Sequence, residues 1–180
     1  MLPCDVRTFA AEMRADDEGV VEGYAALFNV MERGERIAPG AFSKSLAAGD
    51  DIKALWNHDT SVILGRTKNN TLSIVEDGLG LRVRFTPPDT QAARDAHTLI
   101  KGGFVSQMSF GFRIRENGAR VDKEGDQRVR TLLDLELHEV SPVTFPWYTA
   151  TSVIARDEFE EQYNAYAELN NRLRLAEIEI

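Results

Sequence analysis

The segment that most constrains the fold runs from Phe104 to Arg115, where apolar and polar residues alternate. The even-numbered positions are strongly apolar, with Phe104, Met108, Phe110, Phe112 and Ile114. The odd-numbered positions are more polar, with Val105, Gln107, Ser109, Gly111 and Arg113. Because successive side chains of a strand point to opposite faces, this pattern predicts a long strand with one face against the core. On this pattern Ser106 points with the core residues and Ser109 points away from them.

The remaining segments predict an α+β domain. Strand-like stretches are Val6–Met13, Val20–Val30, Ile52–Asn57, Val62–Thr67, Thr71–Glu76, Gly80–Thr86 and Val129–Val140. Two helices are expected, Ala41–Ala48 and a second from the Thr90 cap to Ile100. Residues 36–40 and 116–127 are expected to be loops, and Pro142–Trp147 a turn. Strands and helices do not alternate regularly, which disfavours a doubly wound sheet and favours a bent antiparallel sheet or barrel flanked by helices.

Composition limits the classes of partner. The 180 residues fit one domain, and the net charge of -8 argues against nucleic acid as the main ligand. No hydrophobic run indicates a signal peptide or a membrane span, so we expect no membrane partner. Cys4 is the only cysteine, which excludes an internal disulfide and favours a reducing compartment.

A serine and a histidine offer the chemistry that these residues best support. His58 follows Asn57 in the connection between two predicted strands, and an imidazole can accept a hydroxyl proton near neutral pH. Ser109 lies on the polar face of its strand, and Gly111 on the same face leaves room for a substrate backbone. A solvated serine or histidine would be the ordinary interpretation of either alone. Their combination favours acyl transfer by an activated serine.

Other titratable residues have weaker assignments. His97 lies in the second helix and is expected at the surface, whereas His138 shares the polar face of its strand with Asp134 and Glu136. Strict alternation would turn Glu139 inward, which is costly without a partner. A bulge near Glu139 would instead turn it toward the active face.

Several short strings, taken in order, resemble those of a known family. They are Gly23-Tyr24-Ala25-Ala26-Leu27-Phe28-Asn29, Pro39-Gly40-Ala41-Phe42, Asn57-His58-Asp59, Leu64-Gly65, Met108-Ser109-Phe110-Gly111-Phe112 and Glu139-Val140-Ser141-Pro142-Val143-Thr144. In this order the chain resembles the prohead (procapsid) maturation proteases of tailed bacteriophages, which are related to the herpesvirus assemblin proteases. The resemblance spans Val20 to Ala155.

This resemblance implies a serine endopeptidase with a bent β-barrel-like core and no cofactor. It would cut scaffold or major capsid protein segments, and often itself, inside the assembling procapsid in the host cytoplasm. His58 would be the general base, Ser109 the nucleophile and Glu139 the third catalytic residue. The herpesvirus relatives use a second histidine, for which His138 is the candidate here. The protease domain is expected at residues 1–155.

Residues 156–180 are expected to form a C-terminal helical extension that begins near Asp157. Apolar residues recur there at helical spacing: Phe159, Tyr163, Tyr166, Leu169, Leu173, Ala176 and Ile180. This stripe either packs on the protein's own core or binds a partner, in a homo-oligomer or on scaffold or capsid subunits.

Two other classes of function stay open at this point. One is a non-catalytic capsid assembly or scaffold-binding factor, in which the serine and histidine are incidental. The other is a metal hydrolase using His58, Asp59, His138 and Glu139, residue types that can bind zinc. No His-x-x-x-His helix or cysteine cluster supports the metal site.

Overall fold

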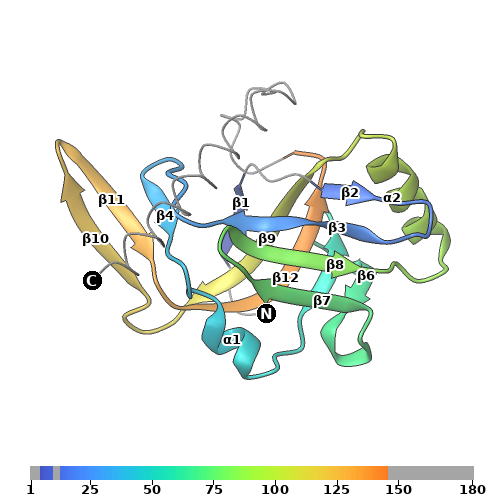
Figure 1. Cartoon of the computed structure of the whole chain (residues 1–180), viewed down its shortest axis with the longest axis horizontal. Coiled ribbons are helices and arrows are strands. Elements are labelled where there is room, and N and C mark those ends of the chain that lie inside the picture. The colour runs from blue at the N-terminus through green and yellow to red at the C-terminus, as the bar shows by residue number, and fades with distance from the viewer. Residues whose placement is uncertain (1–4, 10–12, 146–180) are drawn as a thin grey trace, which may run out of the picture. The chain divides into compact units, whose positions relative to one another are not determined.

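Three β-sheets form the framework of the described part of this computed structural model, which covers residues 5–9 and 13–145 (Figure 1). These residues belong to one compact unit, Met1–Tyr148, and the second unit, Thr149–Ile180, lies outside the described part of the chain. The predicted C-terminal helix and the boundary at residue 155 therefore also lie outside it. No helix within residues 5–9 and 13–145 is long and apolar enough to cross a membrane.

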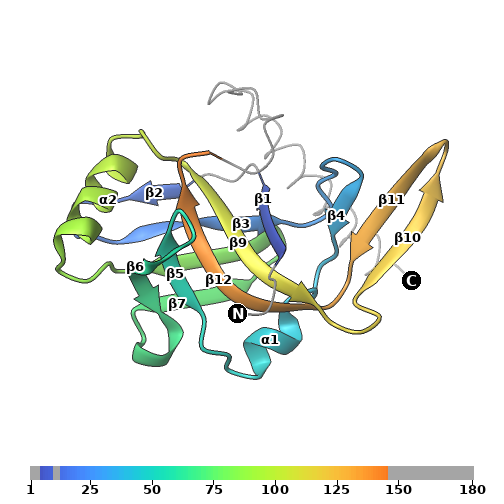
Figure 2. The same cartoon turned by 180° about the vertical axis from the view of Figure 1, so that it is seen from behind.

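The largest sheet has five strands in the order β1-β9-β12-β5-β6. Their bounds are β1 Asp5–Phe9, β9 Gln107–Ile114, β12 Leu135–Val143, β5 Lys53–Trp56 and β6 Asp59–Arg66. β12 pairs antiparallel with β9 and parallel with β5, so it lies between two segments that are distant in the chain (Figure 2).

Two smaller sheets and two α-helices complete the described fold. The four-stranded sheet has the order β2-β3-β8-β7, with β2 Met13–Ala15, β3 Val21–Leu27, β8 Gly80–Phe85 and β7 Leu72–Glu76. The three-stranded sheet has the order β10-β11-β4, with β10 Ala119–Glu124, β11 Gln127–Leu132 and β4 Glu35–Ile37. The helices are α1 Ser43–Ala47 and α2 Gln91–Lys101, and a 3₁₀ turn, η1, covers Thr67–Asn69.

The core is built on the apolar face of β9, as the alternation predicts. Met108, Phe110 and Phe112 are fully buried, and they join one cluster with apolar residues of β3, β8 and β12. Phe110 stacks on Phe112 with ring centroids 5.1 Å apart and meets Phe42 edge to face at 5.4 Å. Such aromatic pairs add stability beyond the area that they bury.

Locally signalled elements form as predicted. β7 and β8 make a hairpin whose turn is closed by Asp77, because its Oδ1 accepts hydrogen bonds from the N–H groups of Leu79 and Gly80. The hydroxyl of Thr90 caps α2 by accepting from the N–H of Ala93. The α+β class is confirmed, whereas a barrel is not: the described strands form three open sheets, two of which contain parallel pairs.

The prediction for the start of the long strand is wrong. β9 begins at Gln107, because the N–H groups of Phe104 and Val105 both bond to the carbonyl of Leu99 and hold these residues in the turn that ends α2. Phe104 is consequently 80% exposed and Ser106 is also exposed, contrary to the expectation that both point with the core.

Other predicted boundaries also need correction, since the loop expected at 36–40 and the turn expected at 142–147 begin within β4 and β12. The expected loop at 116–127 contains β10, which pairs with β11 across a two-residue turn at Gly125, where φ is +61°. The single strand expected at Val129–Val140 is two strands, since the carbonyl of Gly118 binds the N–H groups of Leu133 and Asp134 between them. The segment expected as one strand at Val6–Met13 contributes β1 and β2 to different sheets.

Candidate active site

His58 lies in a tight turn between β5 and β6, as the sequence predicts. Trp56 pairs with Asp59, which leaves Asn57 and His58 as the two turn residues. Their φ angles are +50° and +62°, the left-handed values of a type I′ hairpin turn. Asparagine is favoured in such turns and histidine tolerates a positive φ better than most residues, but for any residue other than glycine this conformation costs energy. The surrounding structure must therefore hold this turn in place.

The side chain and backbone of Asn57 tie the turn to the end of β12. The Asn57 N–H donates to the carbonyl of Pro142 at 3.0 Å. Its Nδ2 donates to Thr144 Oγ1 at 3.2 Å, and its Oδ1 accepts from the Thr144 N–H at 2.8 Å. These three bonds fix the imidazole-bearing turn against the strand that carries Glu139.

Glu139 faces His58 because β12 contains a bulge. The register with β9 shifts between Leu137 and Glu139, so His138 is the extra residue and Glu139 lies opposite Gly111. Glu139 Oε1 is 2.7 Å from His58 Nδ1, and both side chains are partly buried, at 13% and 30% exposure. A carboxylate at Nδ1 favours the tautomer protonated there, which leaves Nε2 able to accept a proton.

The other titratable candidates have different neighbours. His138 Nε2 lies 4.0 Å from Glu136 Oε1, and His97 Nε2 lies 3.0 Å from the carbonyl of Asp16. The Asp59 carboxylate accepts hydrogen bonds from the hydroxyl and N–H of Ser61, and these bonds lower its pKa. Over the described ranges, no three or more His, Cys, Asp or Glu side chains gather as metal ligands would.

Ser109 lies in the same sheet as Glu139, on a strand with neighbours on both sides. It pairs with Thr8 of β1 and with Ser141 of β12, two positions along from the pair formed by Gly111 and Glu139. Because strand faces repeat every two residues, Ser109, Ser141 and Glu139 share one face. The expectation that Ser109 is accessible is wrong, because its exposure is 0%.

Ser141 is a site residue that sequence reasoning missed. Its hydroxyl donates to Glu139 Oε2 at 2.5 Å and accepts from the His58 N–H at 3.3 Å. It is fully buried. The available signal was its spacing of two residues from Glu139, which places both on one face once Glu139 is turned by the bulge.

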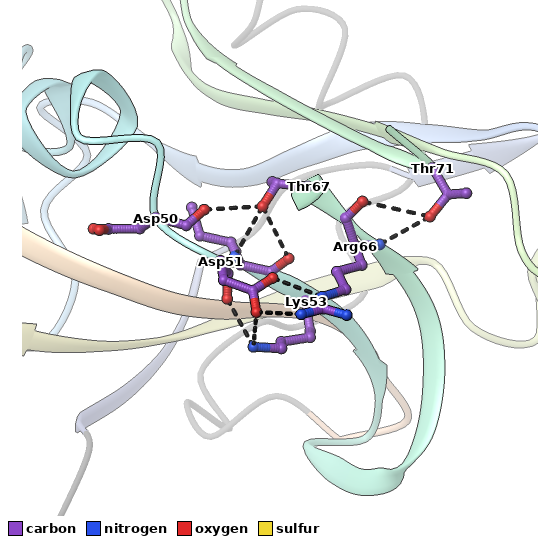
Figure 3. A network of polar contacts seen from close by, with 7 residues as sticks. Asp50, Asp51, Lys53, Arg66, Thr67 and Thr71 are labelled. Atoms are coloured by element: carbon purple, nitrogen blue, oxygen red, sulfur yellow. Dashed lines mark hydrogen bonds and ion pairs between the residues drawn. The ribbon is translucent and has the colours of Figure 1, made fainter. Parts of the chain in front are cut away.

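A polar network fixes the ends of β5 and β6 away from the turn (Figure 3). Arg66 donates two hydrogen bonds to the Asp51 carboxylate, from Nε to Oδ1 at 2.8 Å and from Nη2 to Oδ2 at 2.7 Å. Lys53 Nζ lies 3.0 Å from Oδ2 of the same carboxylate. The hydrogen bonds from Arg66 and then Lys53 hold the pKa of Asp51 well below its usual range. Thr67 Oγ1 accepts from the Ile52 N–H and donates to the carbonyl of Asp50. The strand pair that carries His58 is thereby closed at its other end.

Comparisons with known proteins identify similar chains. Residues 6–165 match the caudovirus prohead serine protease family. The prohead protease of Enterobacteria phage HK97 is 32% identical over 131 residues, which are 72% of this chain and 56% of that protein. The chain thus spans just over half the length of this curated relative. The bacteriophage T4 capsid assembly protease has a similar structure, with a TM-score of 0.55 over 79% of this chain and 98% of that one. At 10% identity, this last likeness shows a shared fold.

Proposed function

Since the chain belongs to the caudovirus prohead serine protease family, we propose that it is a serine endopeptidase of procapsid maturation, with His58, Ser109 and Glu139 as its catalytic residues. The observation that carries this proposal is the contact of 2.7 Å between His58 Nδ1 and Glu139 Oε1. It is the arrangement by which a carboxylate orients a histidine base in serine hydrolases.

The mechanism assigns one task to each residue. His58 Nε2 takes the proton of the Ser109 hydroxyl, whose oxygen attacks the scissile peptide carbonyl. The imidazolium then protonates the leaving amine, which leaves an acyl group on Ser109. Water, deprotonated by the same imidazole, hydrolyses this acyl-enzyme. Glu139 stabilises the imidazolium and keeps the ring oriented throughout.

The proposed substrates are scaffold polypeptide and segments of the major capsid protein, with self-cleavage as a further reaction. The names of the two relatives, a prohead protease and a capsid assembly protease, support this substrate class. The reaction would take place inside the assembling procapsid in the host cytoplasm. It needs neither a cofactor nor nucleic acid.

The burial of Ser109 sets a condition on this function. Its hydroxyl is fully covered, so a polypeptide can reach it only after a rearrangement of the segments around β9. A latent protease that becomes active when the procapsid assembles would meet this condition, if assembly causes the rearrangement that exposes Ser109. The same burial favours the second candidate, a non-catalytic capsid assembly factor of this fold.

Two alanine substitutions separate the candidates. Ser109→Ala and His58→Ala should each abolish cleavage of capsid protein co-assembled with this chain, a loss of roughly 10⁴-fold or more. Ser106→Ala, at an exposed serine outside β9, should leave cleavage unchanged. Mass spectrometry of capsid-protein termini reports the cuts, and a fluorophosphonate labels the nucleophile.

Three results would contradict the proposal, either as to the protease activity or as to Ser109 as its nucleophile. One is the absence of defined termini with the wild-type chain, which supports the assembly factor. Another is full cleavage by Ser109→Ala, which removes Ser109 as nucleophile. A third is a fluorophosphonate adduct at Ser106.

A further inference from the structure

We infer that Ser141 is a positioning residue that locks the histidine base to its carboxylate, an inference that rests on the proposed function. Its hydroxyl touches two parts of the site at once: it donates to Glu139 Oε2 and accepts from the backbone N–H of His58. Since His58 Nδ1 meets the other oxygen of Glu139, the three residues form a closed ring of hydrogen bonds.

The two carboxylate oxygens have separate partners, and this fixes the plane of the carboxylate. The Ser141 hydroxyl lies 2.5 Å from Oε2, and His58 Nδ1 lies 2.7 Å from Oε1. Because each oxygen has its own partner, rotation of the carboxylate would break one of the two bonds. A hydroxyl that donates to a carboxylate generally makes a shorter and stronger hydrogen bond than one between neutral groups. Ser141 therefore restricts rotation of the group that orients the base.

The bond to the His58 N–H acts on the backbone of the turn. His58 has a φ of +62°, a conformation that a residue with a side chain adopts at a cost. The bond from the His58 N–H to Ser141 holds this turn against β12, together with the Asn57 bonds and the contact of His58 with Glu139. Because Ser141 also pairs with Ser109 across β9 and β12, it lies in register with the proposed nucleophile while holding the base.

A second buried serine provides a matched control. Ser45 of α1 is also fully buried, its hydroxyl donates to Asp50 Oδ2 at 2.6 Å, and it accepts from the Leu137 N–H at 3.0 Å. It therefore has the same pattern of one carboxylate acceptor and one backbone donor, with partners other than His58 and Glu139. Ser45→Ala measures what the loss of such a hydroxyl does to folding alone.

The first experiment compares the kinetics of Ser141→Ala and Ser45→Ala on capsid substrate assembled with the full chain. Both should lower the melting temperature by a similar few degrees, since each leaves buried polar groups without a partner. Ser141→Ala should lower kcat roughly 10- to 100-fold with little change in KM, because a misplaced base slows the chemical step. Ser45→Ala should change kcat by less than about twofold. A Ser141→Ala protein that unfolds where Ser45→Ala stays folded would show a structural role and overturn the inference.

The second experiment needs no activity. Proton NMR of the full chain should show a hydrogen-bonded His58 Nδ1–H signal in the wild type and in Ser45→Ala, identified by its loss in His58→Ala. In Ser141→Ala this signal should broaden or disappear. An unchanged signal there, or a fluorophosphonate adduct on Ser141, would overturn the positioning role. If the wild-type chain cuts nothing, the proposed function fails, while this signal still tests the ring of hydrogen bonds.

Discussion

One inserted residue in β12 decides which side chain meets the histidine base. The alternation along this strand turns Glu139 inward, and the bulge at His138 reverses it, so that Glu139 and Ser141 share the face of Ser109. The family resemblance favoured Glu139 and kept His138 as the alternative. The bulge that decides between them depends on pairing with another strand. In the structure His58 contacts Glu139, while His138 lies beside Glu136.

The charge of Glu139 is expected to matter more than its size. Glu139→Gln keeps the shape of the side chain but stabilises an imidazolium less and can hold the wrong tautomer, so kcat should fall roughly 10²- to 10⁴-fold. His138→Gln, one residue away, should change kcat by less than about threefold. Cleavage rates of capsid substrate under single-turnover conditions provide the comparison. If the His138 variant is the inactive one, the second histidine is the third catalytic residue.

At the scale of elements, the β5–β6 hairpin holds the base at one end and is closed by the Asp51 network at the other. Its two strands are adjacent in sequence, but the turn is clamped to β12 through Asn57 and Thr144. Asn57 is the vulnerable residue of this hairpin, because it has a positive φ and its side chain bonds to Thr144, just after β12.

Asn57→Ala should therefore affect both stability and activity. It removes two hydrogen bonds to Thr144 and leaves an alanine at a φ of +50°, for an expected loss of about 2–4 kcal/mol of unfolding free energy. The matched control is Asn70→Ala, which places alanine at a φ of +60° after η1, for about 1–2 kcal/mol. Urea unfolding and cleavage assays should show roughly a tenfold or greater loss of kcat for Asn57→Ala alone. Equal kinetics in the two variants would exclude a role of this clamp in orienting His58.

The elements that sequence analysis predicted correctly are those with local signals. The Asp77 turn between β7 and β8 and the Thr90 cap of α2 depend on neighbours within a few residues. The location of His58 between two strands also follows from the local pattern. The features that were missed depend on contacts that an alternation of apolar and polar residues does not encode. They are the bonds from Phe104 and Val105 to Leu99 that delay the start of β9, the pairing of β10 with β11, and the burial of Ser109.

At the scale of the molecule, the site exists because β12 joins segments far apart in sequence. His58 precedes β6, Ser109 is in β9, and Glu139 and Ser141 are in β12, which pairs with β9 on one side and β5 on the other. The spacing of the motifs indicates which residues belong together. It does not indicate that one pairing is parallel, or that β1 returns to cover the far edge of β9 beside Ser109.

The stability of the whole unit should depend on pH through Glu32, which precedes the tight turn leading into β4. The backbone N–H of Glu32 donates to the carbonyl of Glu35, and the N–H of Glu35 donates to the carbonyl of Glu32. Within this turn, the carbonyl of Gly34 accepts from the N–H of Arg130 in β11. Burial, opposed by the charge of Arg33, raises the pKa of Glu32 to about 7 from 4.5. Between these values the unfolded chain has lost a proton that the folded protein keeps, so stability falls as pH rises from about 4.5 to about 7.

Glu32→Gln should therefore match the wild type near pH 4.5 and exceed it above pH 7. The expected gain at pH 8 is about 1–2 kcal/mol, because solvent still reaches part of this group and reduces the effect of burial. Urea unfolding at the two pH values measures it, with the exposed Glu116→Gln as control. A gain that is the same at both pH values would show that the introduced amide stabilises the turn by packing or hydrogen bonding rather than by removing a buried charge.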